Sequence, residues 1–141
     1  MIVLDTNVLS EPMREAPSVA VLDWFRSVDE PTAVTAISVG ELLDGAMRLS
    51  DGRRRAELIA AIEHAFDAHR GIVLPYDERA ARACARLQAV RRAAGRPLSV
   101  EDGMIAAICV STGARLATRN TLDFEGLGIE LVNPWQTGTF G

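Results

Sequence analysis

Short apolar segments alternate with longer amphipathic ones along this chain, and this alternation limits the possible folds more than any other feature. The apolar segments are brief, partly β-branched and followed by turn residues, so we predict strands at 1–4, 32–37, 72–74, 115–118 and 129–132. The intervening segments carry apolar residues at helical spacing and cover 18–28, 38–49, 53–69, 77–94 and 99–111. Strands joined by helices form a parallel sheet with helices on both faces. We therefore expect a three-layer α/β/α domain with a central, mainly parallel sheet.

The length and composition indicate one globular domain. The chain has 141 residues, with 48% hydrophobic and 24% charged residues and no internal repeat or linker. We expect the domain to cover 1–135 and the segment 136–141 to be a mobile tail. No apolar run is long enough to cross a membrane, and the N-terminus lacks the pattern of a secretory signal. We therefore expect a cytoplasmic protein without membrane partners.

Four acidic residues lie close to the ends of the predicted elements, namely Asp5, Glu41, Asp102 and Asp123. Asp5 follows the first strand, where we expect a turn, and Asp123 lies in the loop after the fourth strand. Glu41 and Asp102 each come three residues after a serine that is predicted to cap a helix, as in a capping box. Each acid taken singly therefore has a structural explanation.

The joint placement of these acids points to a metal site. Ligands of open parallel sheets bind beyond the carboxyl ends of the strands, where Asp5, Glu41 and Asp123 are expected. The topology alone does not bring Asp102 to that edge. Two unit charges ~4 Å apart cost about 4 kcal/mol at an effective dielectric of 20, so a converging cluster needs protons or cations to neutralise it. Oxygen ligands without His or Cys suit Mg²⁺ or Mn²⁺ rather than zinc, and helix dipoles at Glu41 and Asp102 favour the ionised carboxylates. Phosphodiester hydrolysis is the natural chemistry of such a site.

Five motifs together carry a resemblance to a known family. They are MIVLDTNVLS at 1–10, ISVGEL at 37–42, LSVEDGMIAA at 98–107, LATRNTLDF at 116–124 and VNPW at 132–135. The set, in this order, resembles PIN-domain ribonucleases, and the last motif is similar to the VapC and FitB-type toxins of toxin–antitoxin systems. The resemblance covers residues 1 to about 135.

The resemblance implies a site and an activity. Asp5, Glu41 and Asp102 match the core metal-site acids of the family, and Asp123 matches a more variable fourth position. The polar residues that match the surroundings of that site are Thr118 and Asn120, together with Asn7, which a simple turn explains equally well. Because no acid is missing, the resemblance implies an active Mg²⁺- or Mn²⁺-dependent endoribonuclease. It further implies inhibition by a small antitoxin and assembly into a homodimer.

The basic residues offer weaker indications of RNA contact. The net charge is −4 and all 15 basic residues are arginines. Arg82 and Arg86 belong to a set that recurs at helical spacing (Arg79, Arg82, Arg86, followed by Arg91, Arg92 and Arg96), so part of one helix face is predicted to be basic. We assign Arg82, Arg86 and Arg119 to RNA contact. A solvated surface stripe is the alternative, and it is slightly favoured for the helical arginines.

Adjacent aromatic residues suggest a protein interface or a doubly packed helix. Trp24 and Phe25 cannot both face one core from a single-faced helix. One of them could therefore contact an antitoxin or a second subunit, and packing of the helix from two sides is about equally favoured.

Other functions fit less well. A haloacid-dehalogenase-like phosphatase needs a second Asp where this chain has Asn7, and both that class and receiver-like regulatory domains need a lysine, which is absent. A dinucleotide-binding domain needs a glycine-rich turn after the first strand. A non-catalytic or regulatory α/β module with an acidic cation-binding pocket remains the main alternative, and the sequence leaves a DNA substrate open.

Overall fold

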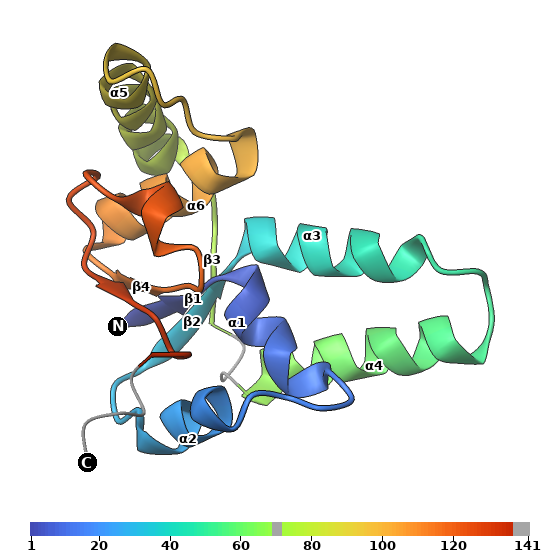
Figure 1. The fold of residues 1–141 in the computed structure, drawn as a ribbon. Helices are drawn as coiled ribbons and strands as arrows, with labels where there is room; N and C mark the ends of the chain where they lie inside the picture. The colour runs from blue at the N-terminus through green and yellow to red at the C-terminus, as the bar shows by residue number, and fades with distance from the viewer. Residues whose placement is uncertain (69–71, 137–141) are drawn as a thin grey trace.

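The centre of the molecule is a five-stranded sheet in which all strands are parallel (Figure 1). The structure, a computed structural model, describes residues 1–68 and 72–136. The strand order is β3–β2–β1–β4–β5, with β1 Ile2–Leu4, β2 Thr32–Thr35, β3 Val73–Leu74, β4 Arg115–Ala117 and β5 Leu131–Val132. In the register of β1 and β4, Leu4 pairs with Ala117, so the residues that follow these two strands are neighbours. The predicted parallel sheet is confirmed.

Helices cover both faces of the sheet and complete three layers (Figure 1). One face carries α5 and α6, and the other carries α1, α2 and the α3–α4 hairpin. The helices are α1 Thr6–Ser10, α2 Val19–Ser27, α3 Ala36–Met47, α4 Arg53–Ala68, α5 Glu78–Ala93 and α6 Val100–Thr112, with short 3₁₀ helices η1 Glu11–Met13 and η2 Thr121–Phe124. The chain therefore has the three-layer α/β/α architecture that the alternation predicts.

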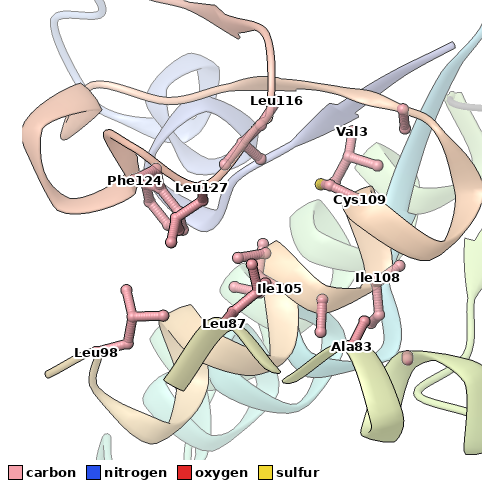
Figure 2. Close-up of a cluster of buried hydrophobic side chains, with 14 residues drawn as sticks. Val3, Ala83, Leu87, Leu98, Ile105, Ile108, Cys109, Leu116, Phe124 and Leu127 are labelled. Carbon is pink, nitrogen blue, oxygen red and sulfur yellow. The ribbon is translucent and has the colours of Figure 1, made fainter. Parts of the chain in front are cut away.

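Successive side chains of β1 point to opposite faces of the sheet and pack into two separate apolar cores. Val3 points to the layer of α5 and α6, where it packs with Leu116 and Ile105. Figure 2 shows this cluster, in which Phe124 and Leu127 from the segment after β4 face the helices. Ile2 and Leu4 belong to the opposite core with residues of α1, α2 and α4. These contacts fix β1, and hence the position of Asp5, from both faces.

Two helix starts differ from the sequence prediction. The expected turn after β1 is the short helix α1, because Val8 and Leu9 are buried against the core as helical spacing allows. The second difference is in α3, which begins at Ala36 rather than Ser38, directly at the end of β2. Its N-cap is Thr35, whose hydroxyl accepts a hydrogen bond from the Ser38 amide at 3.1 Å. The predicted strand over 32–37 is therefore shorter, and the predicted cap at Ser38 is wrong.

Several smaller predictions have clear outcomes. Ser18 and Ser99 cap α2 and α6 as expected, and Gly113 ends α6 with a φ of 69°. Trp24 is buried, and Phe25 is half-buried and packs against the same core, with the two ring centroids 5.3 Å apart. Within the described residues, no helix is long and apolar enough to cross a membrane. The predicted mobile tail, apart from Gln136, lies outside the described residues.

Candidate active site

Asp5 is a buried carboxylate at the carboxyl edge of the sheet. It is 6% exposed and comes directly after β1, where its amide donates to the Ala117 carbonyl at 2.9 Å. Its carboxylate accepts from the Thr6 amide at 2.8 Å and from the Thr118 hydroxyl at 2.7 Å. Burial raises the pKa of Asp5, both hydrogen bonds lower it, and the charge of Asp123 raises it. The net effect is a raised pKa on a carboxylate whose position is firmly held.

A group of hydroxyls beside Asp5 was not predicted as part of the site. Thr6 donates to the Ser38 hydroxyl at 3.1 Å, and Ser38 also lies 3.4 Å from the Thr35 hydroxyl. Thr35 and Ser38 are completely buried. This group ties the first turn of α1 to the first turn of α3, and so links the segments that carry Asp5 and Glu41. The pattern T-x-x-S at the end of β2 was the available signal, because Thr35 is as good an N-cap as Ser38.

Glu41 lies in α3 one turn later than expected. Because α3 begins at Ala36, no acidic residue occupies its first turn, and the predicted capping box between Ser38 and Glu41 does not form. Burial raises the pKa of Glu41, and the charges of Asp5, Glu101 and Asp102 raise it further. Glu41 therefore lies outside the first turn of α3, where the helix dipole was expected to favour its ionised form.

Asp102 reaches the same edge because of the direction of α6. Only two residues separate the end of this helix from the start of β4, and the helix runs back along the sheet, so its N-terminus lies near the carboxyl end of β4. Ser99 caps it by accepting from the Asp102 amide at 3.2 Å. Burial and the charge of Asp5 raise the pKa of Asp102, the hydrogen bond with Ser99 lowers it, and Asp123 and Glu101 raise it. The topology thus supplies the placement that the sequence pattern left open, and Asp102 occupies the first turn of α6 as expected.

Asp123 is exposed in η2, on the segment that follows β4. Its amide donates to the Asn120 carbonyl at 3.0 Å, and its charge is felt by both Asp5 and Asp102. Arg91 of α5 holds this segment by donating hydrogen bonds to the carbonyls of Asp123 and Glu125. Arg91 is only 6% exposed. Its predicted place on a basic surface is therefore wrong.

The other predicted polar residues surround Asp5 and Thr118. The Thr118 hydroxyl accepts from the Asn120 amide at 3.1 Å, so this turn orients the donor to Asp5. Asn7 accepts from the Arg119 amide at 3.3 Å and ties α1 to the same segment. The structure thus brings Asn7, Thr118 and Asn120 together beside Asp5.

The two arginines of α5 that were predicted to contact RNA lie nearer the N-terminus of this helix than Arg91 does. Arg82 is exposed and pairs with Glu78 at 3.4 Å, and Arg86 is also exposed. Helices α5 and α6 are antiparallel. Arg79 near the start of α5 donates to the Ser111 carbonyl at the C-terminal end of α6, and Gln88 later in α5 donates to the Leu98 carbonyl just before the N-terminus of α6. Arg82 therefore lies towards the end of α6 that is remote from Asp102.

The acids form an open, negatively charged surface rather than an enclosed pocket. A shallow cavity of about 450 Å³ borders Glu41, Glu101 and Asp102. Glu101 is an acid that sequence reasoning did not select, although it stands next to Asp102 in the quoted motif. In residues 1–68 and 72–136, no three His, Cys, Asp or Glu side chains stand in a ready-made metal-ligand arrangement. The donor set nevertheless fits a hard cation, since it consists of carboxylates whose mutual repulsion a cation would relieve.

Comparison with known proteins places this geometry in one family. The family model described as PIN domain matches residues 2–127. The chain is 40% identical over 138 residues to "VapC ribonuclease Y4jK" of Sinorhizobium fredii, covering 96% of this chain and 99% of that protein. It is 34% identical over 137 residues to "Toxin FitB" of Neisseria gonorrhoeae, with the same coverage. The crystal structure of FitAcB from Neisseria gonorrhoeae superposes with a TM-score of 0.89 at 34% identity, over 96% of this chain and 99% of that one.

Proposed function

Because this chain belongs to the PIN domain family, we propose that it is a metal-dependent endoribonuclease that acts as the toxin of a toxin–antitoxin pair. The observation that carries the proposal is the buried Asp5 carboxylate, held by Thr6 and Thr118 where the charges of three further acids meet. The relatives named as a ribonuclease and a toxin support the same reading.

We assign the cation to the four predicted acids, Asp5, Glu41, Asp102 and Asp123. Mg²⁺ or Mn²⁺ suits an all-carboxylate set. Asp5 is fixed by its hydrogen bonds, whereas the other three are more exposed, so their side chains can adjust to the ion. When bound, such an ion polarises a phosphoryl oxygen and lowers the pKa of a bound water.

The residues of this chain prepare the site in two ways. Thr118 and the Thr6 amide direct the Asp5 oxygens, so that this carboxylate needs no reorganisation to act as a ligand. The raised pKa values of Glu41 and Asp102 reflect burial and mutual repulsion, so a positive charge placed among the acids would favour their ionised forms. In this role Asn7 and Asn120 are positioning residues, because they hold the segment that carries Thr118.

RNA contact by α5 is a weaker part of the proposal. Arg86 is exposed on α5 and is the better placed of the two helical arginines, whereas Arg82 is paired with Glu78 and lies towards the remote end of α6. An RNA substrate also fits a cytoplasmic protein, which is the location that we expect.

The partner that we propose is an antitoxin segment with an apolar face. A groove of about 300 Å³ lies between η1, α3 and α4, lined mainly by apolar side chains such as Met13, Leu42 and Ile62, and it borders Glu41. A peptide in this groove would reach the acidic site and could block it. We retain the homodimer as an expectation from the family resemblance.

The test is cleavage of a mixed pool of structured RNAs by the purified protein in EDTA, Mg²⁺ or Mn²⁺. We expect cleavage that needs a divalent ion and is abolished by Asp5→Asn, since the buried ligand is lost. Glu63→Gln, which removes an exposed acid of α4, is the matched control and should retain activity. Persistent cleavage by a folded Asp5→Asn protein would contradict the site. If wild-type protein binds the ion without cleaving any RNA, a non-catalytic cation-binding module becomes the better description.

A further inference from the structure

Arg119 and Trp135 form an exposed cation–π pair next to the acidic site. The guanidinium carbon of Arg119 lies over the Trp135 ring, 5.0 Å from its centroid. Arg119 is exposed, whereas Trp135 is half-buried and packs against the core of α1, α2 and α4. The ring is therefore anchored in the core and supports an exposed guanidinium.

The backbone holds both residues at the same edge of the sheet as Asp5. Arg119 follows Thr118, the donor to Asp5, and its amide donates to Asn7. The Thr118 amide donates to the Val132 carbonyl at 2.9 Å, and the Trp135 amide donates to the Asn133 side chain at 3.0 Å. The pair thus rests on the adjoining ends of β4 and β5, beside the carboxylates.

The guanidinium of Arg119 is available to a ligand. Several exposed arginines pair with acids of their own helices, namely Arg26 with Asp23, Arg48 with Asp44, Arg53 with Glu57 and Arg82 with Glu78. Arg119 forms no ion pair with any acid of residues 1–68 and 72–136, although it is a close neighbour of the acidic site. The N–H donors of Arg119 are therefore not used by carboxylates of the described residues.

On the basis of the proposed function, we propose that Arg119, held in place by Trp135, binds a backbone phosphate that flanks the cleaved bond of the RNA strand. The four acids and the net charge of −4 repel a polyanion, so a strand that enters this site needs a cation beside it. A guanidinium is suited to this task because its fork of N–H donors matches two phosphate oxygens. Trp135 is then a positioning residue, which keeps the guanidinium from pairing with the carboxylates.

The first experiment measures affinity for a labelled single-stranded RNA oligonucleotide in EDTA, where no metal-dependent cleavage occurs, over a range of salt concentrations. We expect Arg119→Ala to weaken binding about tenfold and to reduce the slope of log K against log salt by about 0.7, which is the contribution of one phosphate contact. Arg54→Ala removes another exposed arginine, at the start of α4, and should leave the slope unchanged. Equal effects of the two variants, or failure of the wild-type protein to bind the oligonucleotide, would overturn the inference.

The second experiment isolates the role of the ring. We expect Trp135→Leu to lower the affinity for RNA towards that of Arg119→Ala. Trp135→Phe should retain most of the wild-type affinity, because Phe also offers an aromatic face. Identical binding by Trp135→Leu and wild type would refute the positioning role. Cleavage with Mn²⁺ is measured separately: its absence in the wild type counts against the proposed function, whereas the binding series in EDTA still decides the role of Arg119.

Discussion

At the scale of single residues, the Thr118 hydroxyl is the group on which the geometry of Asp5 most depends. It is completely buried, donates to Asp5 at 2.7 Å and accepts from the Asn120 amide at 3.1 Å. One hydroxyl therefore satisfies a buried carboxylate and fixes the turn after β4. A residue of similar shape without the hydroxyl would remove the hydrogen bond to Oδ2 of the buried Asp5 and leave the Asn120 amide without its acceptor.

Replacing Thr118 by a residue without the hydroxyl should affect both stability and cleavage. We expect Thr118→Val to lower the free energy of unfolding by about 1–3 kcal/mol, since the buried Asp5 carboxylate and the Asn120 amide each lose a hydrogen bond. Cleavage should fall about 10–100-fold, as is usual when a group that orients a metal ligand is removed. Thr118→Ser keeps the hydroxyl and should retain most of both. Urea unfolding and initial cleavage rates measure the two effects, and indistinguishable Val and Ser variants would contradict this role.

At the scale of elements, the sequence was sufficient where a local pattern decides the structure. The apolar run before Asp5 ends where β1 ends, and Ser99 caps α6 as its spacing indicates. The start of α3 could not be resolved in this way, because Thr35 and Ser38 are both competent caps and the direct passage from β2 selects the first. That choice moved Glu41 out of the predicted first turn. Local patterns therefore placed the acids on the correct elements but misplaced one of them by a turn.

The burial of Arg91 shows what a sequence pattern cannot supply. By spacing, Arg91 belongs with the exposed arginines of α5. In the folded chain its guanidinium meets carbonyls of Asp123 and Glu125, which are 32 and 34 residues away. No local signal distinguishes it from Arg92, which remains exposed. The contact joins the C-terminal end of α5 to η2, and so determines where Asp123 stands.

This contact yields a prediction about how the elements are held together. We expect Arg91→Met to lower the free energy of unfolding by about 2–3 kcal/mol, because it removes charge-assisted hydrogen bonds from a buried guanidinium to the carbonyls of Asp123 and Glu125. Arg92→Met is the matched control and should change the free energy of unfolding by less than about 0.5 kcal/mol, as an exposed substitution does. Hydrogen exchange should become faster in residues 121–125 of the Arg91 variant. Unchanged protection of η2 would show that Arg91 does not hold this segment.

At the scale of the whole molecule, the acidic edge makes stability depend on pH. The pKa values of Asp5, Glu41 and Asp102 are raised in the folded protein, chiefly by burial, so the folded state binds more protons than the unfolded chain between the ordinary and the raised values. Through this window their contribution to stability falls as pH rises, and above it the loss is complete. Glu30, beside the N-terminal amine and Arg115, has a lowered pKa and acts in the opposite sense. The dependence of the unfolding free energy on pH therefore combines the two effects, and a variant is needed to separate them.

Asp5→Asn provides that separation. We expect the free energy of unfolding of Asp5→Asn, relative to wild type, to rise as pH increases from about 4 to 7 in EDTA, because the variant has no buried carboxyl group that must ionise. A divalent ion should reverse the order at neutral pH: at a concentration 100-fold above its dissociation constant, it stabilises the folded wild type by about 2.7 kcal/mol and leaves the variant nearly unchanged. Urea unfolding of both proteins across this pH range, with and without Mn²⁺, measures each term. A difference between the proteins that does not vary with pH, together with equal responses to Mn²⁺, would mean that the acids at this edge act independently and do not share an ion.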